Sequence, residues 1–133
     1  MAVAVFVKPS NSMLSMCHNF GHKLYRCKNI KECFTRGNYY VIFCVDKQAK
    51  EELVQHFIFE LSSWNPSKGR DFLFVFGKDT GMKMADMIKT VLDKNFSILT
   101  IDAPVNTVFW VEPAMAIILW ERYRKCTGTG KNQ

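Results

Sequence analysis

Three continuous apolar runs stand out along the chain. They are Tyr39–Val45, Phe72–Phe76 and Phe96–Ile101, all rich in aromatic and β-branched residues. Runs of this kind are typical of strands covered on both faces, as in a sheet with helices on each side. Residues Tyr25 to Cys27, or those just before them, are expected to add a short edge strand. The Ser63–Arg70 stretch is turn-rich and predicts a loop.

Between these runs, apolar residues recur at helical spacing. We predict helices over Ser12–Phe20, Asn29–Arg36, Ala49–Leu61, Asp79–Ile88 and Glu112–Lys125. Ser10 or Ser12 is a suitable cap for the first helix, and Asn29 for the second. Strands that alternate with helices imply βαβ connections. The pattern therefore predicts an α/β fold, a three-layer α/β/α sandwich with a central sheet of about four strands.

Length and composition indicate one folded domain. The chain has 133 residues, of which 48% are hydrophobic, and this excludes a disordered protein. We expect one α/β domain over residues 1–126 and a flexible tail over 127–133. No apolar run reaches the ~20 residues of a membrane span, and the apolar part of the N-terminus is too short for a signal peptide. The spacing of the five cysteines fits no disulfide framework. These features favour a cytoplasmic protein without a membrane partner.

The net charge of +6 is concentrated at the two ends of the chain. Residues 1–40 carry six basic groups and one acidic group, and residues 119–133 carry four basic groups and one acidic group. A concentrated positive field favours a polyanionic partner. A basic surface with no single partner is the alternative that composition leaves open.

Two short motifs suggest catalysis, but their context argues against it. Asp79-Thr80-Gly81 spells the aspartic-protease triplet, yet it leads into a Met-rich helical segment of an α/β chain. We interpret it as a helix start. A Cys–His pair such as Cys17 with His56 has no third group to orient it. We therefore expect no enzyme, no cofactor and no small-molecule substrate.

A cluster of potential metal ligands lies in the first quarter of the chain, comprising Cys17, His18, His22, Cys27 and Cys33. Zinc sites usually take two pairs of ligands, each pair two to four residues apart. Only His18 and His22 form such a pair, so we expect no metal site.

A basic stretch leads into the helix predicted at Asn29. It contains Lys23, Tyr25, Arg26, Lys28 and Lys31. Lysine and arginine neutralise phosphates, a helix start offers free N–H groups, and a tyrosine ring can stack on a base. The stretch is therefore a candidate RNA-binding segment, and a solvated basic face is the alternative.

The order of these elements resembles a known family. A helix ends at Thr35-Arg36-Gly37, the strand YYVIFCV follows, a later strand leads to Gly77–Met82, and Glu121–Cys126 closes the last helix. Over residues 12–126 the chain resembles the kink-turn-binding superfamily of ribosomal and nucleolar proteins. Within it, the chain is most similar to the family of the twelfth small-subunit ribosomal protein of eukaryotes. The superfamily carries Gly-x-Asn-Glu where this chain has Arg26-Cys27-Lys28-Asn29.

The resemblance implies a structural constituent of the small ribosomal subunit, bound to ribosomal RNA and neighbouring ribosomal proteins in the cytoplasm. Another ribonucleoprotein (ribonuclease P, a small nucleolar particle or the large subunit) and a protein-interaction module of the same fold are the alternatives. The family's contacts correspond to Arg26, Lys28, Asn29, Lys31, Lys78, Thr80, Gly81 and Lys83, to which the basic stretch adds Lys23 and Tyr25. Contacts to phosphate are expected to outnumber contacts to bases. If these residues do not bind RNA, the basic stretch Arg122–Lys125 is the next candidate for the RNA-binding face.

Overall fold

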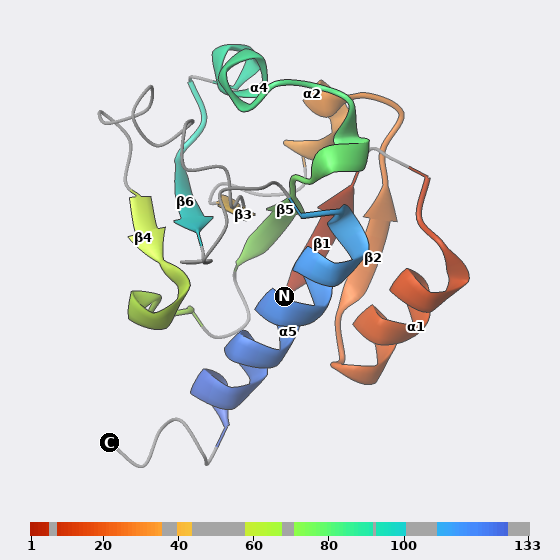
Figure 1. The fold of residues 1–133 in the computed structure, drawn as a ribbon, viewed down its shortest axis with the longest axis vertical. Helices are drawn as coiled ribbons and strands as arrows, with labels where there is room; N and C mark the ends of the chain where they lie inside the picture. The colour runs from red at the N-terminus through yellow and green to blue at the C-terminus, as the bar shows by residue number, and fades with distance from the viewer. Residues whose placement is uncertain are drawn as a thin grey trace.

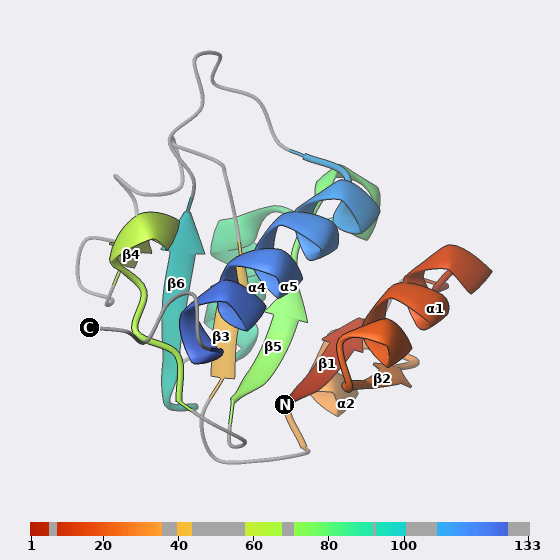
Figure 2. The same cartoon turned by 90° about the horizontal axis from the view of Figure 1, so that it is seen from below.

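The computed structural model describes residues 1–5, 8–35, 40–43, 58–67, 71–91, 93–100 and 109–127. Within them, six strands form one sheet in which every neighbouring pair is parallel. The spatial order is β2-β1-β5-β3-β6-β4, which Figure 2 shows from right to left. The strands are β1 (Ala2–Val5), β2 (Lys23–Arg26), β3 (Tyr40–Phe43), β4 (Ile58–Glu60), β5 (Phe72–Val75) and β6 (Phe96–Thr100).

Four α-helices and two 3-10 turns accompany the sheet among these residues (Figure 1). They are α1 (Asn11–Asn19), α2 (Ile30–Cys33), α4 (Met84–Thr90), α5 (Val111–Cys126), η1 (Leu61–Ser63) and η2 (Lys78–Thr80). Ser10 caps α1, because its Oγ accepts a hydrogen bond from the Met13 N–H at 3.2 Å. Asn29 caps α2 in the same way through the Glu32 N–H. Both caps were predicted from the sequence.

The described residues form two buried cores, and the sheet shares each core with different helices. Leu73 and Val75 of β5 share a core with residues of α1 and α5, such as Cys17 and Ile118. The alternate residue Phe74 lies in a second core with residues of α2 and α4. Because side chains alternate along a strand, a strand buried on both faces is apolar at most of its positions. This explains the unbroken apolar runs in the sequence.

The α/β class and the three apolar strands are confirmed. The structure has β3, β5 and β6 inside the predicted runs, and Lys23–Arg26 forms the predicted edge strand β2. The first and last predicted helices correspond to α1 and α5 within one residue at each end. The predicted ends at Tyr39, Val45, Ile101 and Arg36 lie outside the described residues.

The expected number of about four strands is wrong, because the sheet has six. β1 was missed altogether, although it lies inside the sheet between β2 and β5. Its four residues are too few to show a period, and valine and alanine at a chain start resemble other apolar segments equally well. Its identity as a strand comes from its two neighbours.

Three predicted helices are wrong in part. The helix predicted over Asn29–Arg36 is shorter, because α2 ends at Cys33 and Phe34 and Thr35 are not helical. In the Ala49–Leu61 prediction, residues 49–57 lie outside the described residues, but Ile58–Glu60 is strand β4 and Leu61 begins η1. Pairing with β6 outweighs the helical spacing there. The Asp79–Ile88 helix instead begins at Met84, because Gly81 has a φ of +75° that no right-handed helix contains.

No helix in the described part of the chain has the length and apolar character needed to cross a membrane.

Candidate nucleic-acid interface

Exposed cations follow the carboxyl ends of three neighbouring strands. Arg26 ends β2 and Lys28 follows it, Lys8 follows β1, and Lys78 follows β5. Since these strands are parallel and adjacent, all of these residues lie at one edge of the sheet, with β2 and β5 roughly 10 Å apart. We define the basic edge as Lys8, Arg26, Lys28, Lys31, Lys78 and Lys83. All six are exposed, and none forms an ion pair with an acidic residue in the described part of the chain.

The strand order also reverses here, because β1 is followed by β2 on one side and β5 is followed by β6 towards the other. After β1 it continues into α1 on one face of the sheet, whereas after β5 it continues through η2 into α4 on the other face. Adjacent parallel strands whose connections leave to opposite faces create the position where open α/β sheets bind ligands. Lys8 and Lys78 flank this position. Sequence reasoning missed Lys8, because only the position of β1 brings it to this edge.

The start of α2 is occupied by its own side chains. Asn29 Oδ1 accepts a hydrogen bond from the Glu32 N–H at 2.9 Å, and Glu32 Oε2 accepts one from the Lys28 N–H at 3.1 Å. These backbone donors are therefore already satisfied and do not offer the anion site that the sequence suggested. The charged side chains of Arg26, Lys28 and Lys31 remain exposed.

Two predicted contacts, Lys23 and Tyr25, do not belong to the basic edge. Lys23 is the first residue of β2, so it lies at the amino edge of the sheet, at the opposite end of the strand from Arg26. Its Nζ lies 5.1 Å from the centre of the Tyr25 ring. Tyr25 is half-buried and packs against the core shared with α2 and α4. The ring is therefore partly engaged in the fold.

The turn after β5 presents its lysines but withholds its threonine. The Thr80 Oγ1 accepts a hydrogen bond from the Gly77 N–H at 3.0 Å, and Thr80 is only 5% exposed. Gly81 is exposed at its positive φ, with open space around it. Of the four contacts predicted in this segment, Lys78 and Lys83 have exposed side chains that can reach a ligand.

The Asp79-Thr80-Gly81 triplet has a structural role. Asp79 Oδ1 accepts a hydrogen bond from the N–H of Val111, the first residue of α5, at 2.9 Å. A carboxylate at this position also interacts favourably with the helix dipole. The sequence predicted that the triplet starts its own helix, but its carboxylate instead caps a helix about thirty residues further along the chain.

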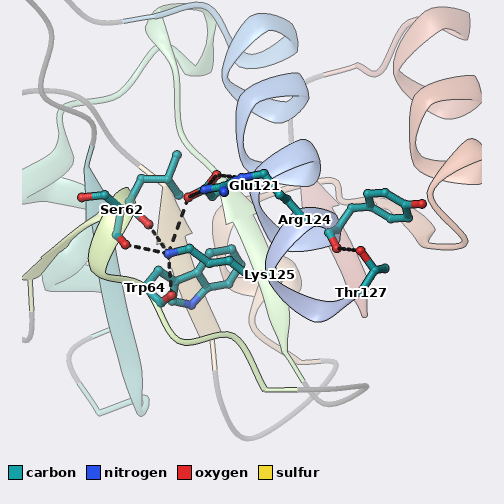
Figure 3. A network of polar contacts seen from close by, with 8 residues as sticks. Ser62, Trp64, Glu121, Arg124, Lys125 and Thr127 are labelled. Carbon is teal, nitrogen blue, oxygen red and sulfur yellow. Dashed lines mark hydrogen bonds and ion pairs between the residues drawn. The ribbon is translucent and has the colours of Figure 1, made fainter. Parts of the chain in front are cut away.

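The C-terminal cations are held by internal contacts, as Figure 3 shows. The Lys125 Nζ donates to the carbonyl oxygens of Leu61, Ser62 and Trp64 at 2.7 to 2.9 Å. Arg124 binds the Glu121 carboxylate through two nitrogens. Arg122 is 6% exposed, lies 3.8 Å from Asp71 and donates to the Ser67 carbonyl. The alternative RNA face at Arg122–Lys125 is thus less available than the basic edge.

Cys17 and His22, which the sequence offered as candidates for catalysis or metal binding, are wholly or partly buried. Burial raises the pKa of the Cys17 thiol to about 11, and its Sγ lies 3.5 Å from Met115 Sδ in the core. His56 lies outside the described residues. Burial also lowers the pKa of His22 to about 4, with the positive charges of the amino terminus and Arg122 contributing next. Among the residues with a described position, no three His, Cys, Asp or Glu side chains are grouped for a metal ion.

Comparisons of the chain with protein-family models, with curated proteins and with solved structures found no match.

Proposed function

We propose that the chain binds RNA as a non-enzymatic subunit of a ribonucleoprotein, with the basic edge on the phosphate–sugar backbone. The observation that carries the proposal is the set of six exposed cations beyond the carboxyl ends of β2, β1 and β5. Cations in such an array release counterions when they neutralise phosphates, and this release dominates the affinity for nucleic acid.

Recognition through the backbone of the RNA fits the hydrogen bonds at this edge. The side-chain oxygens of Asn29 and Thr80, two polar groups expected to contact RNA, accept hydrogen bonds within the protein. Contacts to phosphate position a protein on nucleic acid, whereas contacts to base edges provide sequence specificity. We therefore expect strong salt dependence and weak sequence preference.

The particle that we propose is the small ribosomal subunit, which follows from the resemblance to the twelfth small-subunit protein family. The other ribonucleoproteins and the protein-interaction module stay as alternatives. Sedimentation of tagged protein from cells at high salt distinguishes the particles, because a structural subunit stays with one ribosomal subunit and a free module does not.

We also propose the three-layer α/β/α arrangement, supported by the separate cores under α1 and α5 and under α2 and α4.

Charge reversal at the two edges of the sheet tests the RNA face. Lys28→Glu with Lys83→Glu changes the net charge by −4 at the basic edge. The matched control is Lys89→Glu with Lys94→Glu, which makes the same change at two exposed positions, one in the last turn of α4 and one just before β6. Binding of a fluorescein-labelled RNA hairpin is followed by anisotropy at several salt concentrations, with circular dichroism to check the fold.

The basic-edge variant is expected to lose most of its affinity at 0.1 M salt. Its slope of log affinity against log salt should fall by roughly 0.7 to 0.9 for each phosphate contact removed. The control should bind almost as wild type does. Equal losses in the two variants would show that only net charge matters, and wild-type protein that fails to bind RNA at all would refute the proposed function.

A further inference from the structure

A large aromatic side chain lies within the basic edge. Trp110 directly precedes α5, and 55% of it is exposed. The Lys78 Nζ lies 5.8 Å from the centre of its ring, within the range of a cation–π contact. An exposed tryptophan beside a cation combines the two groups that single-stranded nucleic acid requires, a surface for stacking and a charge for phosphate.

The backbone fixes this pair of side chains. The Lys78 N–H donates to the Phe109 carbonyl at 2.8 Å, and the Asp79 carboxylate accepts from the Val111 N–H. Gly77 approaches the same segment so closely that a Cβ there would lie 2.5 Å from the Val111 nitrogen. These contacts hold the turn after β5 against the residues on both sides of Trp110. The indole and the lysine are therefore presented together without the ordering cost of a loose loop.

We propose that Trp110 stacks on an unpaired base of RNA while Lys78 binds an adjacent phosphate. This inference rests on the proposed function and narrows it to RNA with a single-stranded segment, such as a loop or a bulge. Stacking on an aromatic face tolerates every base, because each base has a π face. The site therefore adds affinity for unpaired RNA while keeping the weak sequence preference expected of the basic edge.

Trp120 provides a matched control on the same helix. It is also 55% exposed, but its ring already stacks on Tyr123, with the ring centres 5.8 Å apart. Arg124, one turn further along α5, is bound by Glu121 (Figure 3). Trp120 lies ten residues from Trp110, about 15 Å along the helix. It matches Trp110 in size and exposure but lies away from the basic edge.

The experiment compares Trp110→Leu with Trp120→Leu on two probes. One probe is a fluorescein-labelled twelve-nucleotide oligoadenylate, and the other is an inorganic polyphosphate chain, which has charge but no bases. Trp110→Leu should weaken binding of the oligoadenylate about five- to a hundred-fold. It should leave polyphosphate binding unchanged, and Trp120→Leu should change neither. Wild-type tryptophan fluorescence should fall when the oligoadenylate binds, and this quenching should be lost in Trp110→Leu.

The outcomes separate this inference from the proposed function. If wild type binds neither probe, the proposed function fails. If wild type binds both and Trp110→Leu binds the oligoadenylate equally well, the stacking role is overturned and the indole is left as a contact for a protein partner. If Trp110→Leu weakens binding of both probes equally, the substitution acts through Lys78, and this too refutes stacking.

Discussion

Lys125 provides the sharpest test of the contacts that hold α5 in place. Its ammonium group has three N–H donors, and each meets a carbonyl oxygen of the segment from Leu61 to Trp64 (Figure 3). The side chain thus joins the last turn of α5 to η1, more than sixty residues earlier in the chain. Lys125→Met keeps most of the aliphatic stem and removes these donors.

The expected loss is about 2 to 3 kcal/mol of unfolding free energy. A hydrogen bond to a charged group contributes roughly 1.5 to 3 kcal/mol, but three bonds from one ammonium are not additive. Two effects reduce the loss when the ammonium group is removed. The Lys125 side chain no longer has to be ordered, which costs up to ~2 kcal/mol, and water can reach the exposed Ser62 carbonyl. The ion pair between Lys125 and Glu121, at 3.5 Å, adds at most ~1 kcal/mol because it lies near the surface.

Arg124→Met is the matched control. Arg124 forms a shorter and more regular ion pair with the same Glu121, but its side chain is 46% exposed, so its removal should cost only ~0.2 to 1 kcal/mol. Urea unfolding followed by circular dichroism measures the unfolding free energy of both variants. In thermal unfolding, the melting temperature of Lys125→Met should fall by roughly 6 to 12 °C. Losses within 0.5 kcal/mol of each other would refute the reasoning that the carbonyl contacts, and not the ion pairs, stabilise this end of α5.

Two further predictions concern the start of α5 and the pH dependence of stability. Gly77→Ala should destabilise the fold by about 2 to 4 kcal/mol in urea unfolding, because its Cβ would clash with backbone atoms of the segment before α5. In the control Gly21→Ala the new Cβ meets no atom within 4 Å, so this variant should lose only the ~1 to 2 kcal/mol that a left-handed backbone costs a residue with a side chain. Equal losses in the two variants would contradict the clash. Because the pKa of His22 is lowered to about 4 in the fold and is about 6.5 when unfolded, the unfolded chain binds the extra proton between these values. Stability should therefore fall as the pH is lowered from about 6.5 to about 4, and His22→Gln, followed by thermal unfolding across this range, should show less of that fall.

The strands that the sequence predicted are those whose local pattern already records tertiary structure. Phe72–Val75 is apolar at every position and Phe96–Thr100 at three of its five, because side chains on both sides of the sheet are buried in a core. The missed strands carry no such record. Ala2–Val5 and Ile58–Glu60 are four and three residues long, and each is defined by the neighbour to which it pairs. Short segments fit helical and extended patterns equally well, so only pairing decides between them.

In the candidate site, too, the sequence does not show which side chains are held by contacts within the protein. The resemblance implied Lys28, Asn29, Lys78 and Thr80 as equivalent RNA contacts, because each corresponds to a contact position of the family. The structure divides them, because Asn29 and Thr80 use their oxygens to hold backbone N–H groups whereas the two lysines extend into solvent. Short polar side chains readily replace backbone partners in caps and turns, whereas long cationic ones reach past them.

The positions of the cations follow from topology. Lys8, Lys28 and Lys78 are separated by twenty and fifty residues, yet each comes just after a strand in an all-parallel sheet. Parallel pairing requires every strand to end at the same edge, so charges placed after strands accumulate there whatever their distance in sequence. At the other end of the molecule, the cations of α5 are bound by Glu121, Asp71 and backbone carbonyls. The basic edge therefore gathers six exposed cations where the strands end, and Trp110 lies beside one of them, Lys78.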